Sequence, residues 1–220
     1  MAYDLYVITD RQIARGLSHS GIARLVIEGG ADVVQLRDKG LPCRDLFAAA
    51  CEIRKITREA GVLFIVNDRI DIAIASGAEG VHLGQDDLPL REARRIAPAG
   101  FIIGVSVGCV AEAVAAETGG ASYVALSPIF PTASKEDAGH GHGIEVLREI
   151  CSAVALPVIA IGGITRKNAP QVVAAGAEGV AVISSVVGQP DISDAARQMK
   201  AIVRNAKARR IASDEKKGPE

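Results

Sequence analysis

The chain has 220 residues, of which 49% are hydrophobic and only 3% aromatic, and it carries a formal net charge of -1. This balance argues against nucleic-acid binding, which usually needs a basic face. No apolar run reaches the roughly 20 residues that a membrane-spanning helix needs. A chain of this length buries one large core and is close to the lower size limit for a complete barrel. We therefore expect one globular domain that binds neither nucleic acid nor membrane.

The four cysteines lack the CxxC spacing of zinc sites, and no signal-peptide pattern comes before the globular part. Two of them, Cys43 and Cys51, fall two turns apart in one expected helix, too far for a disulfide. We therefore predict reduced thiols and a cytoplasmic location. The sequence leaves open whether the chain forms a homo-oligomer.

Apolar runs alternate with stretches of helical period along the chain. The runs predict strands at 4–9, 32–37, 62–67, 80–83, 101–106, 123–127, 157–161 and 179–183. The stretches between them predict helices at 18–28, 43–60, 71–75, 90–97, 110–118, 144–153, 167–174 and 191–205. Continuous Val, Ile and Leu runs fit parallel strands covered by helices. The predicted fold class is α/β, as a single (β/α)8 TIM barrel over residues 1–206.

A Gly-Ala pair opens four of these strands, beginning at Gly30, Gly77, Gly120 and Gly176. Each pair follows an expected helix, and glycine supplies the left-handed backbone that ends a helix. The copies lie about two strand–helix units apart, which supports a ring of eight.

Two segments are expected to lack regular structure. The loop at 128–143 contains Pro131 and two histidines, His140 and His142, and long loops on a rigid scaffold are usually functional or mobile. The stretch at 207–220 is dense in charge, so we predict a disordered or frayed tail.

Two carboxylates, Asp68 and Asp87, follow neighbouring predicted strands. On a barrel both project into the same mouth, where Mg²⁺ would relieve their repulsion. Taken alone, capping of the following helices explains them equally well. The cations Arg37, Lys39 and Lys135 follow strands of the same barrel and would converge with the metal on a polyanion, which favours the metal site.

A second anion site is predicted where Gly162-Gly163 and Ser184-Ser185 follow the last two strands. Glycine backbone N–H groups bind phosphate, although the glycine pair alone would be explained equally well by a tight turn. His82 lies inside an apolar strand and is expected to be a packed, hydrogen-bonded residue. The spacing of His140 and His142 is a weak metal signal. Nothing in the sequence resembles a Ser-His-Asp or Cys-His pair.

These motifs resemble the thiamine phosphate synthase family over residues 4 to 188. The resemblance rests on Val7-Ile8-Thr9-Asp10, Gln35-Leu36-Arg37-Asp38-Lys39, Asn67-Asp68, Gly84-Gln85-Asp86-Asp87, Gly104-Val105-Ser106, Pro128-Ile129-Phe130-Pro131-Thr132 with Lys135, Ile161-Gly162-Gly163-Ile164 and Ile183-Ser184. It implies an enzyme, a transferase of thiamine biosynthesis, that joins a hydroxymethylpyrimidine diphosphate to a thiazole phosphate, or to its carboxylated form, and releases pyrophosphate.

The resemblance also implies roles for individual residues. The pyrimidine diphosphate would be held by Gln35, Arg37, Lys39, Asn67, Ser106 and Lys135, and the thiazole phosphate by Thr132, Ser134, Gly163, Ile183 and Ser184. Asp68 and Asp87 would hold Mg²⁺, and the catalytic residues would be Lys135, Ser106 and Arg37. The partners expected are therefore small phosphorylated substrates.

The chain departs from the family at two places. Val107-Gly108-Cys109 replaces a hydroxyl and an imidazole that usually follow Ser106, and the loop before Gly143 carries a His-Gly-His sequence. Two alternatives stay open at this point. A related thiazole tautomerase would share the barrel without needing a diphosphate site, and a non-catalytic barrel could bind a phosphorylated ligand as a sensor.

Overall fold

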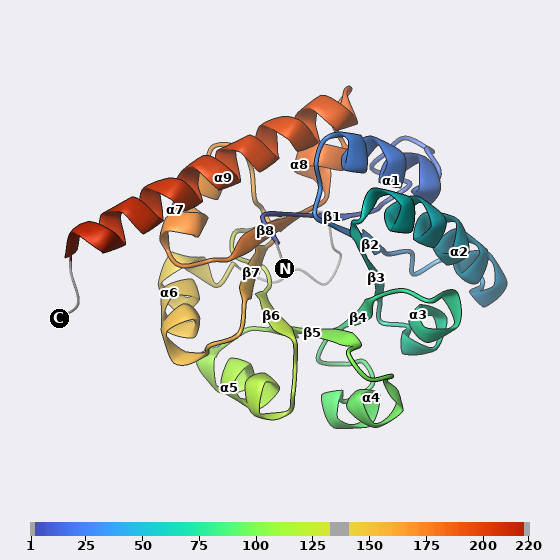
Figure 1. Ribbon diagram of the computed structural model, residues 1–220, viewed down its shortest axis with the longest axis horizontal. Coiled ribbons are helices and arrows are strands. Elements are labelled where there is room, and N and C mark those ends of the chain that lie inside the picture. The colour runs from blue at the N-terminus through green and yellow to red at the C-terminus, as the bar shows by residue number, and fades with distance from the viewer. Residues whose placement is uncertain (1–2, 133–140, 218–220) are drawn as a thin grey trace.

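The computed structural model describes residues 3–132 and 141–217, with side chains as far as residue 213. Its strands pair in parallel in chain order, and the last pairs with the first, so the sheet closes into a barrel (Figure 1). The strands are β1 (Leu5–Ile8), β2 (Val33–Leu36), β3 (Leu63–Asn67), β4 (Gly80–Leu83), β5 (Ile102–Val107), β6 (Tyr123–Leu126), β7 (Val158–Ile161) and β8 (Gly179–Val182). The predicted (β/α)8 fold is confirmed.

Helices surround the barrel and cover the outer face of the sheet (Figure 1). They are α1 (His19–Glu28), α2 (Cys43–Ala60), α3 (Ile70–Ser76), α4 (Leu90–Ile96), α5 (Val110–Thr118), α6 (Gly143–Ala153), α7 (Ala169–Ala174), α8 (Ser184–Val187) and α9 (Ile192–Lys217). The short α8 was not predicted. The glycines of the four Gly-Ala pairs all have a positive φ, between 71° and 114°, as expected of residues that end a helix.

Two apolar layers hold the barrel together. One lies between the strands and the surrounding helices, and the other fills the inside of the barrel. All three tyrosines of the chain, Tyr3, Tyr6 and Tyr123, belong to the inner layer. Because their hydroxyl groups need partners when buried, they carry polar chemistry into an otherwise apolar interior.

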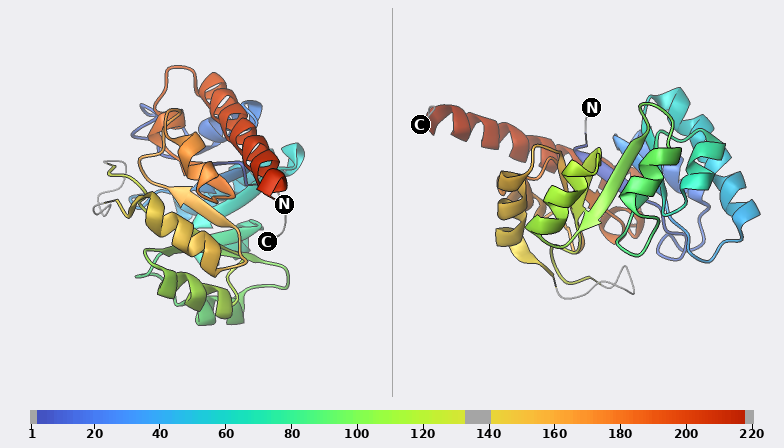
Figure 2. Two further views of the ribbon diagram at one scale, coloured as in Figure 1. Left: turned by 90° about the vertical axis from the view of Figure 1, so that its left-hand side faces the viewer. Right: turned by 90° about the horizontal axis from the view of Figure 1, so that it is seen from below.

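The expectation of a disordered tail from residue 207 was wrong for residues 207–217. Helix α9 continues to Lys217 instead of ending near Asn205, and its last turns project beyond the barrel (Figures 1 and 2). It packs against α1, α7 and α8. Two of the charged residues that suggested a solvated tail, Lys207 and Arg210, form ion pairs or hydrogen bonds with the barrel instead.

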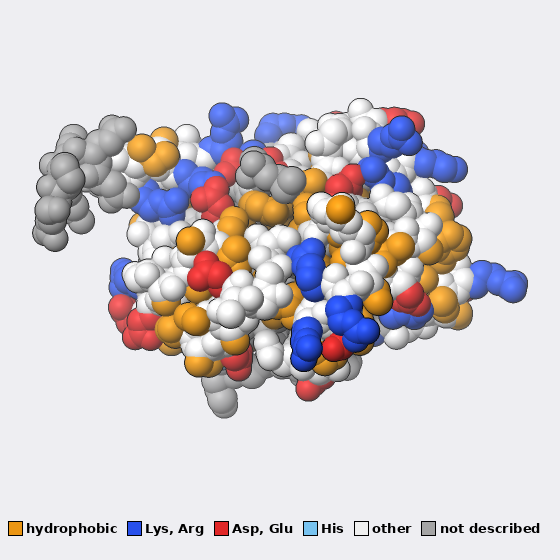
Figure 3. Space-filling view, turned by 60° about the horizontal axis from the view of Figure 1, so that its bottom comes forward, with side chains coloured by type: hydrophobic (Ala, Val, Ile, Leu, Met, Phe, Trp, Pro, Cys, Tyr) orange, Lys and Arg blue, Asp and Glu red, His pale blue; other side chains and the backbone are white. Residues whose placement is uncertain are grey.

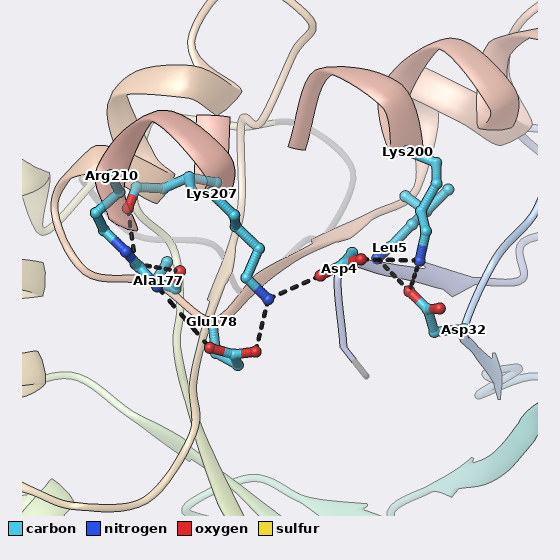
Figure 4. A network of polar contacts seen from close by, with 9 residues as sticks. Asp4, Leu5, Asp32, Ala177, Glu178, Lys200, Lys207 and Arg210 are labelled. Atoms are coloured by element: carbon cyan, nitrogen blue, oxygen red, sulfur yellow. Dashed lines mark hydrogen bonds and ion pairs between the residues drawn. The ribbon is translucent and has the colours of Figure 1, made fainter. Parts of the chain in front are cut away.

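An ionic network joins α9 to the amino-terminal ends of the strands (Figure 4). Lys207 Nζ lies 2.7 Å from Asp4 Oδ1 and 2.6 Å from Glu178 Oε1, and Lys200 binds both Asp4 and Asp32. Burial raises the pKa of Asp4, but the hydrogen bonds from the two lysines outweigh it and hold that pKa below its usual value. Nearby, Arg210 Nη1 donates to two backbone carbonyl groups at 2.9 Å.

We expect Lys207→Met to lower the free energy of unfolding at neutral pH by about 1 kcal/mol, because it breaks two partly buried ion pairs. Asp4 has a lowered pKa in the folded state, so this stabilisation is complete above the unfolded pKa of about 4 and is lost as pH falls through the folded one. Urea denaturation at several pH values measures the difference. Arg204→Met, at an exposed position of the same helix, is the control; an equal effect of both variants would contradict the prediction.

The face seen in Figure 3 shows acidic and basic side chains interspersed among hydrophobic ones, without a dominant patch of either sign. Among the residues that the structure describes, no helix combines the length and apolar character required to cross a bilayer.

Candidate active site

A network of hydrogen-bonded side chains crosses the inside of the barrel, from Tyr123 at the start of β6 to Ser106 near the end of β5. Gln35 Nε2 donates to Tyr6 Oη at 2.7 Å, and the hydroxyl oxygens of Tyr6 and Tyr123 are 3.0 Å apart. His82 Nδ1 lies 3.0 Å from Tyr123 Oη, and its Nε2 lies 2.9 Å from Ser106 Oγ. Thus two predicted site residues, Gln35 and Ser106, stand at the two ends of one network.

The contacts of this network allow one continuous order of donors and acceptors. Because Gln35 donates to Tyr6, a continuous order has the Tyr6 hydroxyl donating to Tyr123 and the Tyr123 hydroxyl donating to His82 Nδ1. Burial raises the pKa of both tyrosines, so both keep their protons. In this order His82 Nε2 donates to Ser106, and the Ser106 hydroxyl hydrogen is left for a ligand.

The contact of His82 with Ser106 brings together a serine and a histidine that the sequence did not pair. It is not a hydrolase triad, because the other ring nitrogen of His82 meets the neutral hydroxyl of Tyr123 and not a carboxylate. The ring of His82 also stacks on that of Tyr123, with centroids 5.6 Å apart. The expectation of a buried, hydrogen-bonded histidine is confirmed, and its partner makes it part of the site.

The carboxyl groups of Asp68 and Asp87 meet in the barrel mouth, as predicted from their strand positions. Burial, followed by the hydrogen bond to Asp87 and its charge, raises the pKa of Asp68 to about 6, against the opposing charges of Lys39 and Arg37. The four residues therefore lie close enough to influence one another. Two acidic groups opposed by two cations form a site that a divalent cation and a polyanion would complete.

Helix capping, the other explanation for these two carboxylates, is wrong. The residues before α3 and α4 are Arg69 and Pro89, and neither helix start has a side-chain capping hydrogen bond. Asp68 instead has a left-handed backbone, with φ of 62°, and Asp87 Oδ2 accepts from the Gly84 N–H at 2.6 Å. A left-handed backbone at Asp68 and the hydrogen bond from Gly84 to Asp87 therefore accompany the meeting of the two carboxyl groups.

A cavity of about 810 Å³ opens between the ends of β6, β7 and β8. It is lined by four residues predicted to hold the thiazole phosphate, namely Thr132, Gly163, Ile183 and Ser184. Ser185 also lines it, and among the described residues its buried hydroxyl oxygen has no hydrogen-bond partner. Arg166 and Lys167 add two cationic side chains to the lining. A buried hydroxyl that lacks a partner fits a site whose ligand supplies acceptor oxygens.

The residues packed against the turn after β7 leave no room for side chains at Gly162 and Gly163, whether or not a ligand binds there. Gly162 and Gly163 have φ of 95° and 64°, and a Cβ on Gly163 would lie 2.7 Å from Phe130 Cβ. The Phe130 N–H donates to the Gly162 carbonyl at 3.1 Å, which ties the segment after β6 to the turn after β7. This close approach adds a structural reason for glycine to the predicted phosphate contact.

The structure thus gathers most of the predicted residues in the barrel mouth, with Asn67 at the end of β3 beside Asp68. Ser134, Lys135 and His140 lie outside the described residues. Sequence reasoning missed the roles of Tyr6 and Tyr123, whereas Ser185 belongs to the serine pair predicted for the second anion site. The concentration of tyrosine in two strands of a chain poor in aromatic residues was the available signal for the two tyrosines.

Gly108 and His142, which belong to the two segments that differ from the family pattern, lie in contact. The His142 backbone N–H donates to the Pro128 carbonyl at 2.9 Å, and its Nε2 lies 3.2 Å from the Ser127 carbonyl oxygen. A Cβ on Gly108 would lie 3.0 Å from His142 Cε1. An imidazole from the segment before α6 therefore occupies the space beside the end of β5.

Gly108→Ala is expected to lower the free energy of unfolding by about 1 kcal/mol, because the new methyl group would lie 3.0 Å from the imidazole and the ring would have to shift by a few tenths of an ångström. In a His142→Ala background the same change should cost less than about 0.5 kcal/mol. Urea denaturation of the four chains of this double-mutant cycle measures the coupling. Equal costs in both backgrounds would show that the contact does not constrain the two residues.

Comparison with known proteins identifies the family of this chain. A family model described as thiamine monophosphate synthase matches residues 5–186. A thiamine-phosphate synthase of Methanoculleus marisnigri is 62% identical, covering 94% of this chain and 99% of the relative, and one of Methanocella arvoryzae is 57% identical, covering 92% and 96%. The solved structure of a thiamine phosphate pyrophosphorylase from Pyrococcus furiosus has a TM-score of 0.86 and 42% identity, covering 93% of this chain and 96% of that one. The chain therefore belongs to the thiamine monophosphate synthase family and is a transferase of thiamine biosynthesis.

Proposed function

We propose that this barrel binds a hydroxymethylpyrimidine diphosphate at the ends of β2 to β5 and a thiazole phosphate at the ends of β6 to β8, and joins them. The proposal depends most on one observation: Asp68, Asp87, Arg37 and Lys39 lie close together, and a separate cavity lies at the ends of β6 to β8. The group of two carboxylates and two cations suits a diphosphate with a divalent cation, and the cavity suits a second phosphate.

The pyrimidine would lie against the network inside the barrel. Gln35 and Ser106 offer an amide and a hydroxyl at its two ends, and Asn67 adds a second amide at the end of β3. Arg37 and Lys39 would bind the diphosphate, and Lys135 would add a third cation from the loop after β6. Among them, Arg37, Ser106 and Lys135 are the residues to which we assign the catalytic roles.

Asp68 and Asp87 are suited to hold Mg²⁺. Within the described part of the chain, no three His, Cys, Asp or Glu side chains gather as a metal site. Mg²⁺ commonly takes only one or two carboxylates and completes its shell with water and substrate phosphates. When bound, the ion would neutralise part of the negative charge of the leaving pyrophosphate.

The thiazole phosphate, or its carboxylated form, would occupy the cavity at the ends of β6, β7 and β8. Backbone N–H groups at Gly163 and the hydroxyl of Ser184 would bind the phosphate, with Ser185 as an additional donor. Thr132, Ser134 and Ile183 complete the residues that we assign to this ligand. The phosphate would place the thiazole nitrogen toward the pyrimidine.

The reaction breaks the bond between the pyrimidine methylene carbon and the diphosphate oxygen, and the pyrophosphate leaves with the bonding electrons. The aminopyrimidine stabilises the resulting benzylic-type cation, and the lone pair of the thiazole nitrogen forms the new carbon–nitrogen bond. Arg37 and Lys39 would stabilise the departing charge, while the barrel aligns the two reactants. The protein needs no nucleophile for these steps.

We also propose the kind of partner and the cellular location of the chain. The partners of the chain are small phosphorylated molecules, consistent with the cations beside Asp68 and with Arg166 and Lys167 in the lining of the cavity. All four cysteines are free, which suits the reducing environment of a cytoplasm.

Release of pyrophosphate tests the proposal. The full chain is assayed with Mg²⁺ and both substrates, and with each substrate alone; pyrophosphate should appear in proportion to thiamine phosphate only when both are present. Isomerisation of a thiazole phosphate without the diphosphate substrate would support the tautomerase instead. Binding without turnover would support a sensor. The cations beside Asp68 favour the synthase, because a tautomerase has no diphosphate to bind.

A further inference from the structure

A buried polar cluster lies beneath the loop that follows β2, and no step described above uses it. It consists of Thr9 after β1, His19 at the first position of α1, and Asp38, with Arg11 at its outer edge. His19 is only 3% exposed, and both of its ring nitrogens have partners: Nδ1 lies 2.8 Å from Thr9 Oγ1, and Nε2 lies 3.1 Å from Asp38 Oδ2. A histidine so completely engaged between two elements fixes their relative position.

Asp38 folds the loop onto itself. Its Oδ1 accepts from the Gly40 N–H at 2.9 Å and from the Leu41 N–H at 3.0 Å, while Oδ2 accepts from Arg11 Nε at 3.0 Å. Burial raises the pKa of Asp38, but these donors and His19 outweigh it and hold that pKa below its usual value. Asp38 is therefore a carboxylate, and it orders the backbone immediately after Lys39.

The direction of each hydrogen bond follows from that charge. A carboxylate only accepts, so His19 carries its proton on Nε2, and its Nδ1 accepts from the Thr9 hydroxyl. Burial lowers the pKa of His19, which favours this neutral form. The Thr9 oxygen in turn accepts from the Arg37 N–H at 3.3 Å. The backbone is thus held on both sides of the segment that presents Arg37 and Lys39.

We propose that His19 is a positioning residue for the diphosphate subsite: it joins Thr9 to Asp38 and so fixes the backbone from which Arg37 and Lys39 reach the anion. The inference rests on the proposed function for the identity of that anion. It concerns a residue of α1 whose side-chain hydrogen bonds are to Thr9 and Asp38, and to which the proposed function assigns no substrate contact. It assigns to His19 an effect on one of the two subsites only.

The test compares His19→Leu with His19→Gln in the full chain. Leucine removes both hydrogen bonds, whereas glutamine keeps an N–H for Asp38 and a carbonyl oxygen for Thr9. We expect His19→Leu to weaken binding of inorganic pyrophosphate with Mg²⁺ about tenfold in calorimetric titrations, and to raise KM for the pyrimidine diphosphate similarly. KM for the thiazole phosphate should change less than about twofold, and His19→Gln should recover most of the loss.

Ile22→Ala is the matched control, since Ile22 is a fully buried residue of the same helix that contacts the apolar core. It should lower the melting temperature while leaving pyrophosphate binding and both KM values unchanged. If His19→Leu does not fold, His19→Gln and Ile22→Ala still decide: stronger loss of pyrophosphate binding in the control than in His19→Gln would overturn the inference. So would unchanged pyrophosphate binding, or equal losses for both substrates, in a folded His19→Leu chain. A wild-type chain that binds pyrophosphate but releases none from the two substrates would overturn the proposed function alone.

Discussion

Asp87→Ala and Asp68→Asn are each expected to lower turnover by roughly a thousandfold while leaving the barrel folded. A divalent cation stabilises developing charge by several kcal/mol, and each 1.4 kcal/mol corresponds to a factor of about ten. The meeting of the two carboxyl groups beside Arg37 and Lys39 is the structural reason for the expectation. Pyrophosphate release with and without excess chelator provides the measurement, and full activity in chelator would contradict the role in metal binding.

Asp68→Asn should also stabilise the metal-free protein at neutral pH. In the folded chain the pKa of Asp68 is raised, mainly by burial, from 3.8 to about 6. Between these values the folded state holds a proton that the unfolded state has released, so stability falls as pH rises through this range. The asparagine variant does not titrate and avoids that loss. Its advantage should therefore be present above about pH 6 and absent near pH 4.

Thermal denaturation in chelator measures this advantage. Mg²⁺ should narrow the difference, since it stabilises only a chain that can bind it. Asp71→Asn is a suitable control, because Asp71 is an exposed carboxylate of the following helix that pairs with Arg69. An Asp68→Asn chain that is less stable than the wild type at neutral pH would contradict the prediction. It would show that burial of the Asp68 carboxylate beside Asp87 does not destabilise the metal-free protein.

The arrangement of strands and helices was predictable because its signals are local. The Gly-Ala pairs end helices through backbone conformation alone, and continuous apolar runs identify buried parallel strands. Helix α9 was predicted to end too early because a charged stretch has the same composition whether solvent or distant carboxylates surround it. Lys207 meets Asp4, which lies 203 residues away in the chain, and no local pattern reveals such a partner.

The site was predictable in part for the same reason. Asp68 and Asp87 follow adjacent strands, so their meeting follows from the barrel itself. The contact of His82 with Ser106 requires knowledge of which side chains point inward at the same level. The contact of His142 with Gly108 joins two departures from the family pattern that looked independent in the sequence, since it depends on where the segment before α6 crosses the end of β5.

Gly163→Val is expected to abolish measurable binding of the thiazole phosphate, while the pyrimidine diphosphate still binds with Mg²⁺. A Cβ at this position would lie 2.7 Å from Phe130 Cβ and 2.9 Å from the carbonyl oxygens of Phe130 and Pro131. The backbone φ of 64° adds strain for any residue with a side chain. Strain and overpacking, each costing about 1–3 kcal/mol, would displace the segment after β6 from the cavity and weaken binding by about a hundredfold or more.

Two further variants distinguish backbone strain, overpacking against Phe130 and the loss of a single hydrogen bond to the phosphate. Gly61→Val has nearly the same φ, 67°, but nothing within 4 Å of its Cβ, so it should lower stability without affecting either ligand. Ser184→Ala removes one neutral hydrogen bond and should weaken thiazole phosphate binding at most about tenfold. Calorimetric titration of each ligand alone decides the matter. Equal loss of both ligands in Gly163→Val would mean that the whole barrel mouth had rearranged, and the division into two subsites would have to be withdrawn.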